Sequence, residues 1–280
     1  MNAHTPRALI VGMGIGGLAT AMRLQEIGWE PVIVERAADR RPAGYFIGLW
    51  ETGRATAQRM GVLDAIGNRA DPTGITYDIE RDGRRRPGMG YGDLTGDPRL
   101  ILRGDIEAAL YDTVAPRTEI RYGTTPVALD EHPDGVDVTL RTTVGDHATG
   151  TTERFDLVVG TDGLRSTVRR PAIESIRAAF GPEPNGPVLE HLLQQFEQAD
   201  DYLFDSVHQV EMDTWHTDRI VVLGDAAWCL TLYSGMGAST AMAGADLLGT
   251  VLGEDPRDDR GGHRAQHRCP DAGGGRSHQP

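Results

Sequence analysis

The chain has 280 residues, of which 39% are hydrophobic and 25% charged, and its formal net charge is −13. This composition is typical of a globular protein with a sizeable core. The negative charge argues against a nucleic-acid partner, which is bound through clustered positive charge. The sequence contains no lysine, which excludes lysine Schiff-base chemistry and a P-loop lysine.

Cysteine usage and hydropathy indicate the compartment of the protein and whether it enters a membrane. Two cysteines, Cys229 and Cys269, make no disulfide framework. No apolar run is long enough to cross a bilayer, and no secretory leader opens the chain. We therefore expect a cytoplasmic protein that inserts into no membrane. His263, His267 and Cys269 have a loosely metal-like spacing, but they lie in a stretch of Gly, Arg, His and Pro, so we predict no metal site.

The first 36 residues have the pattern of a strand, a helix and a second strand. Residues 8–11 (ALIV) form a short apolar run typical of a buried parallel strand. Apolar residues then recur at helical spacing from Ile15 to Met22, and Gly28 stands where a helix C-cap glycine belongs. Residues 31–34 (PVIV) predict the second strand, so this region has the pattern of a βαβ unit.

Helical and extended segments follow in an irregular order. The remaining predicted elements are a helix around residues 55–66, a turn-rich segment over 73–100 with a strand at 75–79, a strand and helix over 100–115, alternating strands over 118–144 with a hairpin turn at Asp134-Gly135, buried strands at 155–160 and 219–224, and a helix from about 237 to 252.

A glycine-rich turn joins the first strand to the first helix. Gly12, Gly14 and Gly17 fit the pattern G-x-G-x-x-G, with Gly16 inside the same turn. In this pattern the first glycine permits the tight turn, the second lets a pyrophosphate approach the backbone, and the third lets the helix pack against the strand. The N–H groups and dipole at the helix start attract the phosphates. The turn therefore predicts a dinucleotide site.

Two residues at the end of the second strand complete this site. Glu35 follows Gly17 by 18 residues, where an acidic side chain accepts hydrogen bonds from an adenosine ribose. Arg36 comes next and is a further candidate ligand. Because an acid stands at this position, a 2′-phosphate is disfavoured, and the predicted ligand is FAD or NAD.

Motifs far downstream separate FAD from NAD. Residues 156–169 read DLVVGTDGLRSTVR, and residues 219–227 read RIVVLGDAA before YSGMG at 233–237 opens a helix. These segments resemble the two later fingerprints of the class A flavoprotein monooxygenases, the single-component family that includes p-hydroxybenzoate hydroxylase. Residues 44–48, 59–61 and 204–252 are most similar to the actinobacterial members that act on aromatic polyketides and antibiotics.

The resemblance implies a role for each matching residue. Asp225 would contact the ribityl chain of FAD, Asp162 would serve the pyrophosphate region and NAD(P)H use, and Arg103 would touch FAD from the start of a mid-chain helix. The helix from residue 237 would aim its positive end at the flavin. The candidate cofactor-binding residues are Gly12, Gly14, Gly16, Gly17, Glu35, Arg36, Arg103, Asp162, Gly163, Gly224, Asp225, Gly235, Met236 and Gly237.

The family's chemistry sets the expected function. NAD(P)H reduces non-covalently bound FAD, O₂ adds at flavin C4a, and the hydroperoxide delivers one oxygen to an electron-rich ring. The cofactor supplies the difficult step, so we assign no catalytic residue, and we predict a small aromatic or polyketide-type substrate. Two alternatives stay open: a non-catalytic FAD-binding remnant and an NAD-dependent dehydrogenase. No oligomeric state is predicted.

The resemblance also predicts the fold and the domain boundaries. We expect an α/β fold, in which a Rossmann-like FAD-binding domain with a parallel sheet carries a reduced antiparallel substrate region. Trp228 and Leu232 stand where the family usually has His and Pro. The connection from Arg170 to Gly224 is short for the family, so we infer an internal deletion and a truncated C-terminus. The expected segments are FAD domain 1–72, 101–170 and 219–252, substrate region 73–100 and 171–218, and a disordered tail 253–280.

Overall fold

The computed structural model describes residues 4–40, 44–71, 74–90, 93, 98–144, 147–162, 186–198, 209–210, 212–230 and 234–254. Its centre is a five-stranded parallel sheet with the order β12-β11-β1-β2-β7. These strands are β1 (Arg7–Val11), β2 (Glu30–Val34), β7 (Glu119–Arg121), β11 (Leu157–Gly160) and β12 (Ile220–Val222). The predicted α/β fold with a parallel sheet is confirmed.

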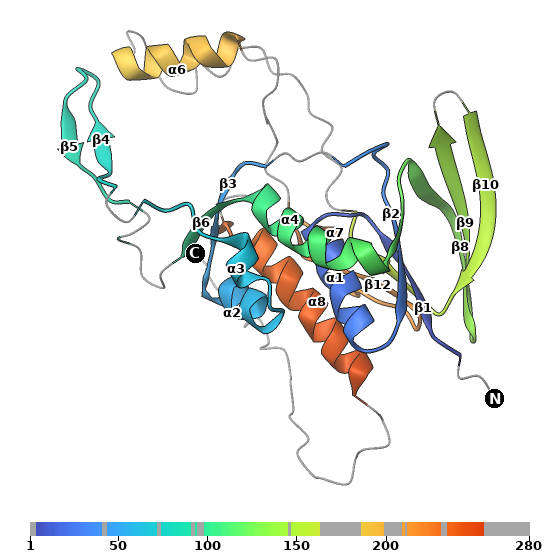
Figure 1. Ribbon diagram of the computed structural model, residues 1–280. Coiled ribbons are helices and arrows are strands. Elements are labelled where there is room, and N and C mark those ends of the chain that lie inside the picture. The colour runs from blue at the N-terminus through green and yellow to red at the C-terminus, as the bar shows by residue number, and fades with distance from the viewer. Residues whose placement is uncertain are drawn as a thin grey trace, which may run out of the picture.

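The two faces of this sheet are covered by different layers (Figure 1). The helices α1 (Ile15–Glu26), α4 (Arg103–Val114) and α8 (Gly237–Gly253) cover one face. An antiparallel sheet of β8 (Thr124–His132), β9 (Gly135–Val144) and β10 (His147–Phe155) covers the other. Along β1, Ala8 and Ile10 belong to the helix-side core, whereas Leu9 packs with Val138 and Phe155 on the opposite side. Burial on both faces explains why this strand is apolar at consecutive positions.

Smaller elements complete the described structure. The strands β3 (Phe46–Leu49) and β6 (Arg99–Leu102) pair antiparallel, as do β4 (Tyr77–Ile79) and β5 (Arg85–Pro87). The remaining helices are α2 (Glu51–Arg59), α3 (Leu63–Ile66), η2 (Ala115–Arg117), α6 (Pro187–Gln198) and α7 (Asp225–Trp228). The β4–β5 hairpin and α6 lie together, away from the central sheet (Figure 1). None of the described helices is long and apolar enough to span a membrane.

The structure corrects three predicted boundaries. The helix predicted at 55–66 is two helices, α2 and α3, which Gly61 separates with a φ of 71°. The hairpin turn consists of Pro133 and Asp134, because Gly135 already pairs with His132 in the sheet. The strand predicted at 155–160 is interrupted at Asp156, whose carboxylate accepts a hydrogen bond from the Arg7 N–H at 2.7 Å. There the chain leaves the antiparallel sheet and enters the parallel one.

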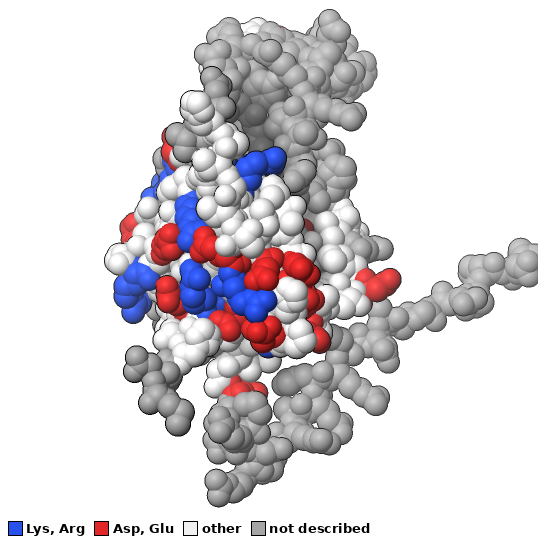
Figure 2. Space-filling model, turned by 90° about the vertical axis from the view of Figure 1, so that its right-hand side faces the viewer, with Lys and Arg blue, Asp and Glu red and all other residues white. Residues whose placement is uncertain are grey.

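The outer face of the antiparallel sheet carries charges of both signs. Figure 2 shows acidic and basic side chains interspersed over this side of the molecule. Arg154 on β10 pairs with Asp134 at 2.9 Å and with Asp137 at 2.8 Å. Arg121 on β7 pairs with Glu153 on β10 at 2.5 Å, which links the parallel sheet to the antiparallel one. Opposite charges therefore offset one another locally on this face.

The carboxylate of Asp246 connects α8 to two neighbouring helices. Its Oδ1 lies 3.0 Å from Nε of Arg23 on α1, and its Oδ2 accepts a hydrogen bond from Nη2 of Arg59 on α2 at 2.8 Å. The Asp246 side chain is only 15% exposed. Because water is largely excluded, the loss of this charge would leave two guanidinium groups without their shared partner.

We therefore expect Asp246→Asn to destabilise the fold. The substitution should lower the free energy of unfolding by about 1–3 kcal/mol, and each kcal/mol corresponds to about 2–4 °C in melting temperature for a chain of this size. Thermal unfolding followed by circular dichroism measures the change. Glu254→Gln removes the same charge from the exposed end of α8 and serves as the control. Equal melting temperatures for the two variants would contradict a stabilising link from Asp246 to α1 and α2.

Candidate cofactor site

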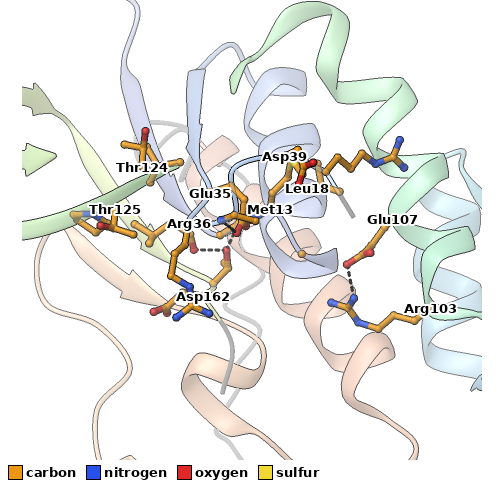
Figure 3. Close-up of a pocket in the computed structure, with 18 residues that line it drawn as sticks. Met13, Leu18, Glu35, Arg36, Asp39, Arg103, Glu107, Thr124, Thr125 and Asp162 are labelled. Atoms are coloured by element: carbon orange, nitrogen blue, oxygen red, sulfur yellow. Dashed lines mark hydrogen bonds and ion pairs between the residues drawn. The ribbon is translucent and has the colours of Figure 1, made fainter. Parts of the chain in front are cut away.

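A cavity of about 350 Å³ opens at the carboxyl ends of β1 and β2. Its wall combines the glycine turn, the end of β2, the first turns of α4, the start of β8 and the end of β11. Figure 3 shows side chains from these elements converging on one space. In an open parallel sheet, ligands bind in the crevice beyond the carboxyl ends of the strands. The cavity therefore lies where this architecture binds a nucleotide.

The glycine turn has the close contacts that its sequence predicts. Gly12 has a φ of 104°, and a Cβ there would lie 2.8 Å from the carbonyl oxygen of Thr161. A Cβ on Gly17 would lie 2.0 Å from the carbonyl oxygen of Gly12, so the first helical turn packs directly on the strand end. At Gly14 a Cβ would meet only the Arg103 guanidinium, at 3.4 Å. Gly12 and Gly17 thus allow the turn itself, whereas Gly14 leaves its cavity side open.

The start of α1 suits an anion. No side chain caps this helix, and its first turn contains no acidic residue. The first N–H groups of a helix have no partner within the helix and carry its positive dipole end. Gly16 is not crowded, since a Cβ there would lie 3.7 Å or more from its nearest neighbours, Ala241 and Thr161. These features fit the phosphates of a dinucleotide.

Glu35 stands at the rim of the cavity, at the end of β2. Its Oε2 accepts a hydrogen bond from the Met13 N–H at 2.9 Å, and its Oε1 accepts one from the Ala37 N–H at 2.8 Å. The carboxylate therefore joins the glycine turn to the segment after β2. A carboxylate oxygen has a second lone pair, so each oxygen keeps acceptor capacity for a ribose hydroxyl.

Arg103 and Glu107 lie one helical turn apart on α4 and both line the cavity. Nη1 of Arg103 lies 2.7 Å from Oε1 of Glu107. Burial raises the pKa of the Glu107 carboxyl, an effect that the positive charges of Arg103 and Arg40 partly offset. The predicted FAD ligand Arg103 is therefore present in the cavity with an acidic partner that the sequence pattern did not single out.

Other cavity residues divide into predicted and unpredicted ones. Arg36 and Asp162 line the cavity as expected, and Gly163 lies outside the described residues. Sequence reasoning missed Thr161, whose hydroxyl donates to the carbonyl oxygens of Val11 at 2.8 Å and Gly12 at 3.1 Å. It also missed the residues brought in by tertiary structure, which are Asp39, Arg40, Glu107, Thr124, Thr125 and Pro126. A threonine directly after a Gly-ended strand was the available signal for Thr161, and the i,i+4 spacing from Arg103 was the signal for Glu107.

The remaining predicted residues form a second cluster, at the start of α7 and α8. Gly224 and Gly235 have φ values of 63° and 62°, and a Cβ on Gly237 would lie 3.4 Å from Oδ1 of Asp225. Met236 occupies the N-cap position of α8 without a side-chain hydrogen bond. These residues lie outside the cavity wall described above. The link between the two clusters is electrostatic, because the Arg103 charge acts on Asp225.

The carboxyl of Asp225 is incompletely hydrated even though the residue as a whole is exposed. The protein packed around it raises the pKa of this carboxyl by desolvation, and the Arg103 charge offsets only part of the effect. An acid with a raised pKa in the folded state binds its proton more tightly there than in the unfolded chain. Above that pKa the ionised Asp225 therefore disfavours the fold, and this cost disappears as the pH falls and the carboxyl becomes protonated.

We expect Asp225→Asn to raise the melting temperature of the cofactor-free protein slightly at neutral pH, because the amide carries no charge to desolvate. The gain should be small, since solvent reaches the residue, and it should shrink at mildly acidic pH, where the wild-type carboxyl takes up its proton. Thermal unfolding of both proteins at the two pH values measures the effect. A variant less stable than the wild type at neutral pH would show that the carboxylate supports the fold.

Comparison with known proteins identifies the family. The model of the "FAD binding domain" family matches residues 5–182. A flavin-dependent monooxygenase of Legionella longbeachae is 23% identical, with 88% of this chain and 80% of the relative aligned. The 3-amino-4-hydroxybenzoate 2-monooxygenase PtnB3 of Streptomyces platensis is 32% identical over 179 residues, 62% of this chain and 43% of that protein. The crystal structure of the tetracycline destructase Tet(55) has the same fold, with a TM-score of 0.71, 23% identity and coverage of 90% and 82%.

The family match spans well over half of the chain and includes the glycine turn, Glu35, Arg103 and Asp162. The cavity geometry agrees with it, since an uncapped helix start, an acid at the end of β2 and an arginine beside Gly14 face one space. The chain therefore belongs to the FAD-binding domain family, as an FAD-dependent monooxygenase of the class that includes p-hydroxybenzoate hydroxylase.

Proposed function

We propose that FAD lies along the line from Glu35 to the start of α8. In this arrangement the ribose hydroxyls meet Glu35, with Arg36 and Asp162 beside the adenosine half, and the pyrophosphate lies at the start of α1 against Arg103. Asp225 then faces the ribityl chain. The full set of proposed ligands is Gly12, Gly14, Gly16, Gly17, Glu35, Arg36, Arg103, Asp162, Gly163, Gly224, Asp225, Gly235, Met236 and Gly237. The observation that carries the proposal is the Arg103 guanidinium, which lies over Gly14 and acts electrostatically on Asp225.

The chain's own residues bind and orient the cofactor and adjust its charge. The uncapped N-terminus of α8 would stabilise the negative charge that the flavin ring gains on reduction. FAD supplies the redox chemistry with NAD(P)H as reductant and O₂ as co-substrate. We propose non-covalent binding, since no His lies in the matching motifs and Cys229, the one Cys there, donates its thiol to the Leu230 carbonyl at 3.5 Å.

The first test concerns Glu35. We expect Glu35→Ala to weaken FAD binding by about tenfold to a hundredfold, because one charged acceptor of the ribose hydroxyls is lost, on the order of 1–3 kcal/mol. Titration of the apoprotein with FAD measures the dissociation constant. Glu30→Ala, at the other end of β2 and exposed, is the matched control. An unchanged dissociation constant for Glu35→Ala would place the ribose elsewhere.

The proposed substrate is a small electron-rich aromatic, with aromatic polyketides as the first class to test. Two findings support this choice. The name of the Streptomyces relative specifies an aromatic substrate, and that of the solved structure specifies tetracycline. The resemblance of residues 44–48 and 59–61 to actinobacterial polyketide monooxygenases points the same way. We propose the cytoplasm as the compartment because the reaction consumes NAD(P)H.

A second candidate function follows from the length of the chain between its motifs. The alignment with the Legionella protein runs over 325 positions yet takes in 88% of this chain, about 246 residues, so about 80 positions face no residue here. This supports the internal deletion that the short connection from Arg170 to Gly224 predicts. Closed, dry active sites prevent side reactions with water. A chain with a reduced substrate region would bind FAD and oxidise NAD(P)H, but release hydrogen peroxide.

One set of measurements separates the candidates. We expect the purified protein to be yellow and to release free FAD on denaturation; a colourless protein that reduces NAD would instead be a dehydrogenase. NAD(P)H consumption, hydrogen peroxide and hydroxylated product are then measured together on a panel of phenols and aromatic polyketides. Because of the missing positions, we expect peroxide to account for most of the NAD(P)H consumed. Stoichiometric hydroxylation with little peroxide would contradict a deletion that impairs hydroxylation. FAD binding without NAD(P)H oxidation would identify a non-catalytic remnant.

A further inference from the structure

Glu107 is an acidic side chain on the wall of a cavity that we propose binds an anion. It lies on α4 one turn after Arg103, and only 15% of its side chain is exposed. Figure 3 shows both side chains directed into the same space, with their ion pair drawn between them. A mostly buried carboxylate near phosphates repels them. Glu107 must therefore make a favourable contribution to phosphate binding that offsets this repulsion.

The geometry of the ion pair provides that contribution. Oε1 of Glu107 holds Nη1 of Arg103 at 2.7 Å, whereas Nη2 points to Gly14, 3.4 Å from a Cβ built on that glycine. A guanidinium is a rigid planar fork with five N–H donors. Because both Nη atoms belong to one rigid plane attached to the same side chain, holding Nη1 restricts the directions that Nη2 can take. The other side of the fork therefore faces the start of α1.

The charged groups around Glu107 leave Arg103 as its ion-pair partner. The charges that act on it are Arg103 and Arg40, which are positive, and Glu35, which is negative. Arg40 stacks on the Tyr111 ring, with its guanidinium carbon 4.2 Å from the ring centre. Arg103 is thus the one basic group that Glu107 contacts as an ion pair in the described part of the chain.

We propose that Glu107 is a positioning residue for the cofactor: its carboxylate anchors Arg103 so that the other side of the guanidinium meets the FAD pyrophosphate at Gly14. This inference rests on the proposed FAD site and adds to it a residue that makes no contact with the cofactor itself. Orientation before binding reduces the side-chain entropy lost on complex formation. The acceptor oxygen of Glu107 holds Arg103 in place, whereas its negative charge repels the phosphates. We therefore expect the acceptor atom to matter more for FAD binding than the charge.

Four variants of the full chain separate these two effects, with the FAD dissociation constant of the apoprotein as the measurement. Glu107→Ala removes the anchor and should weaken FAD binding by about fivefold to tenfold. Glu107→Gln keeps an acceptor without the charge, so it should bind FAD within about twofold of the wild type or more tightly. Glu107→Leu keeps the packing volume and should resemble Glu107→Ala. Asp112→Ala, on an exposed position of α4, is the control and should bind as the wild type does.

A double-mutant cycle with Arg103→Ala gives the decisive result. If Glu107 acts through Arg103, Glu107→Ala should cause no further weakening in the Arg103→Ala background. Weakening that persists in that background overturns the proposal, as does an equal loss in Glu107→Gln and Glu107→Ala, or unchanged binding in both Glu107→Ala and Glu107→Leu. Melting temperatures of the apoproteins show whether each variant is folded. A wild type that binds no FAD would overturn the proposed function together with this inference, whereas FAD binding without coupling overturns this inference alone.

Discussion

The close approach of the first helix to the end of the first strand is the constraint on which the site depends. A Cβ on Gly17 would lie 2.0 Å from the carbonyl oxygen of Gly12, and a Cβ on Gly12 would lie 2.8 Å from that of Thr161. The Thr161 hydroxyl donates to two carbonyl oxygens at this junction. Because three backbone segments meet here without side chains between them, the turn that leads into α1 borders the same space as Glu35 and Arg103. Any larger residue at Gly12 or Gly17 would move the helix and thereby the anion site.

The charges around this space show why an acidic protein can bind a dinucleotide. The net charge of −13 opposes anion binding at long range, but that field is screened within about one Debye length, roughly 10 Å at moderate salt. Inside the cavity the favourable groups are local: the uncapped helix start, Arg36 and Arg103. Two of the four acidic residues on the wall have partners there, since Glu35 accepts from two backbone N–H groups and Glu107 pairs with Arg103; the other two are Asp39 and Asp162.

Sequence reasoning located the parts of the site that lie within one βαβ unit or one motif. Gly12 and Glu35 are positioned by strand ends, and their pattern has a definite spacing along the chain. Arg103 was predicted from the resemblance to the flavoprotein monooxygenases. Thr124 and Glu107 could not be found in this way. Thr124 reaches the cavity because β7 pairs with β2 and β8 then turns back across it, and Glu107 matters only through the fork of Arg103. Thr124 depends on tertiary contacts that no spacing in the sequence encodes, whereas the i,i+4 spacing of Arg103 and Glu107 indicates their ion pair but not its place on the cavity wall.

The two halves of the proposed FAD site are assembled differently. The proposed adenosine half is built mainly from β1, α1, β2 and the adjoining turn of α4, with Asp162 added after β11, and these elements pack on a core that is buried on both faces of the sheet. The proposed flavin half depends on Gly224, Asp225 and the start of α8, which lie outside the cavity wall. The helix α8 packs on the core through Ala241, Met242 and Ala245, and Asp246 adds an ionic link to α1 and α2. Asp225 belongs to this second half, and desolvation raises the pKa of its carboxyl. In the proposed arrangement, a deletion between Arg170 and Gly224 leaves the adenosine half intact and falls on the part that would enclose substrate and exclude water.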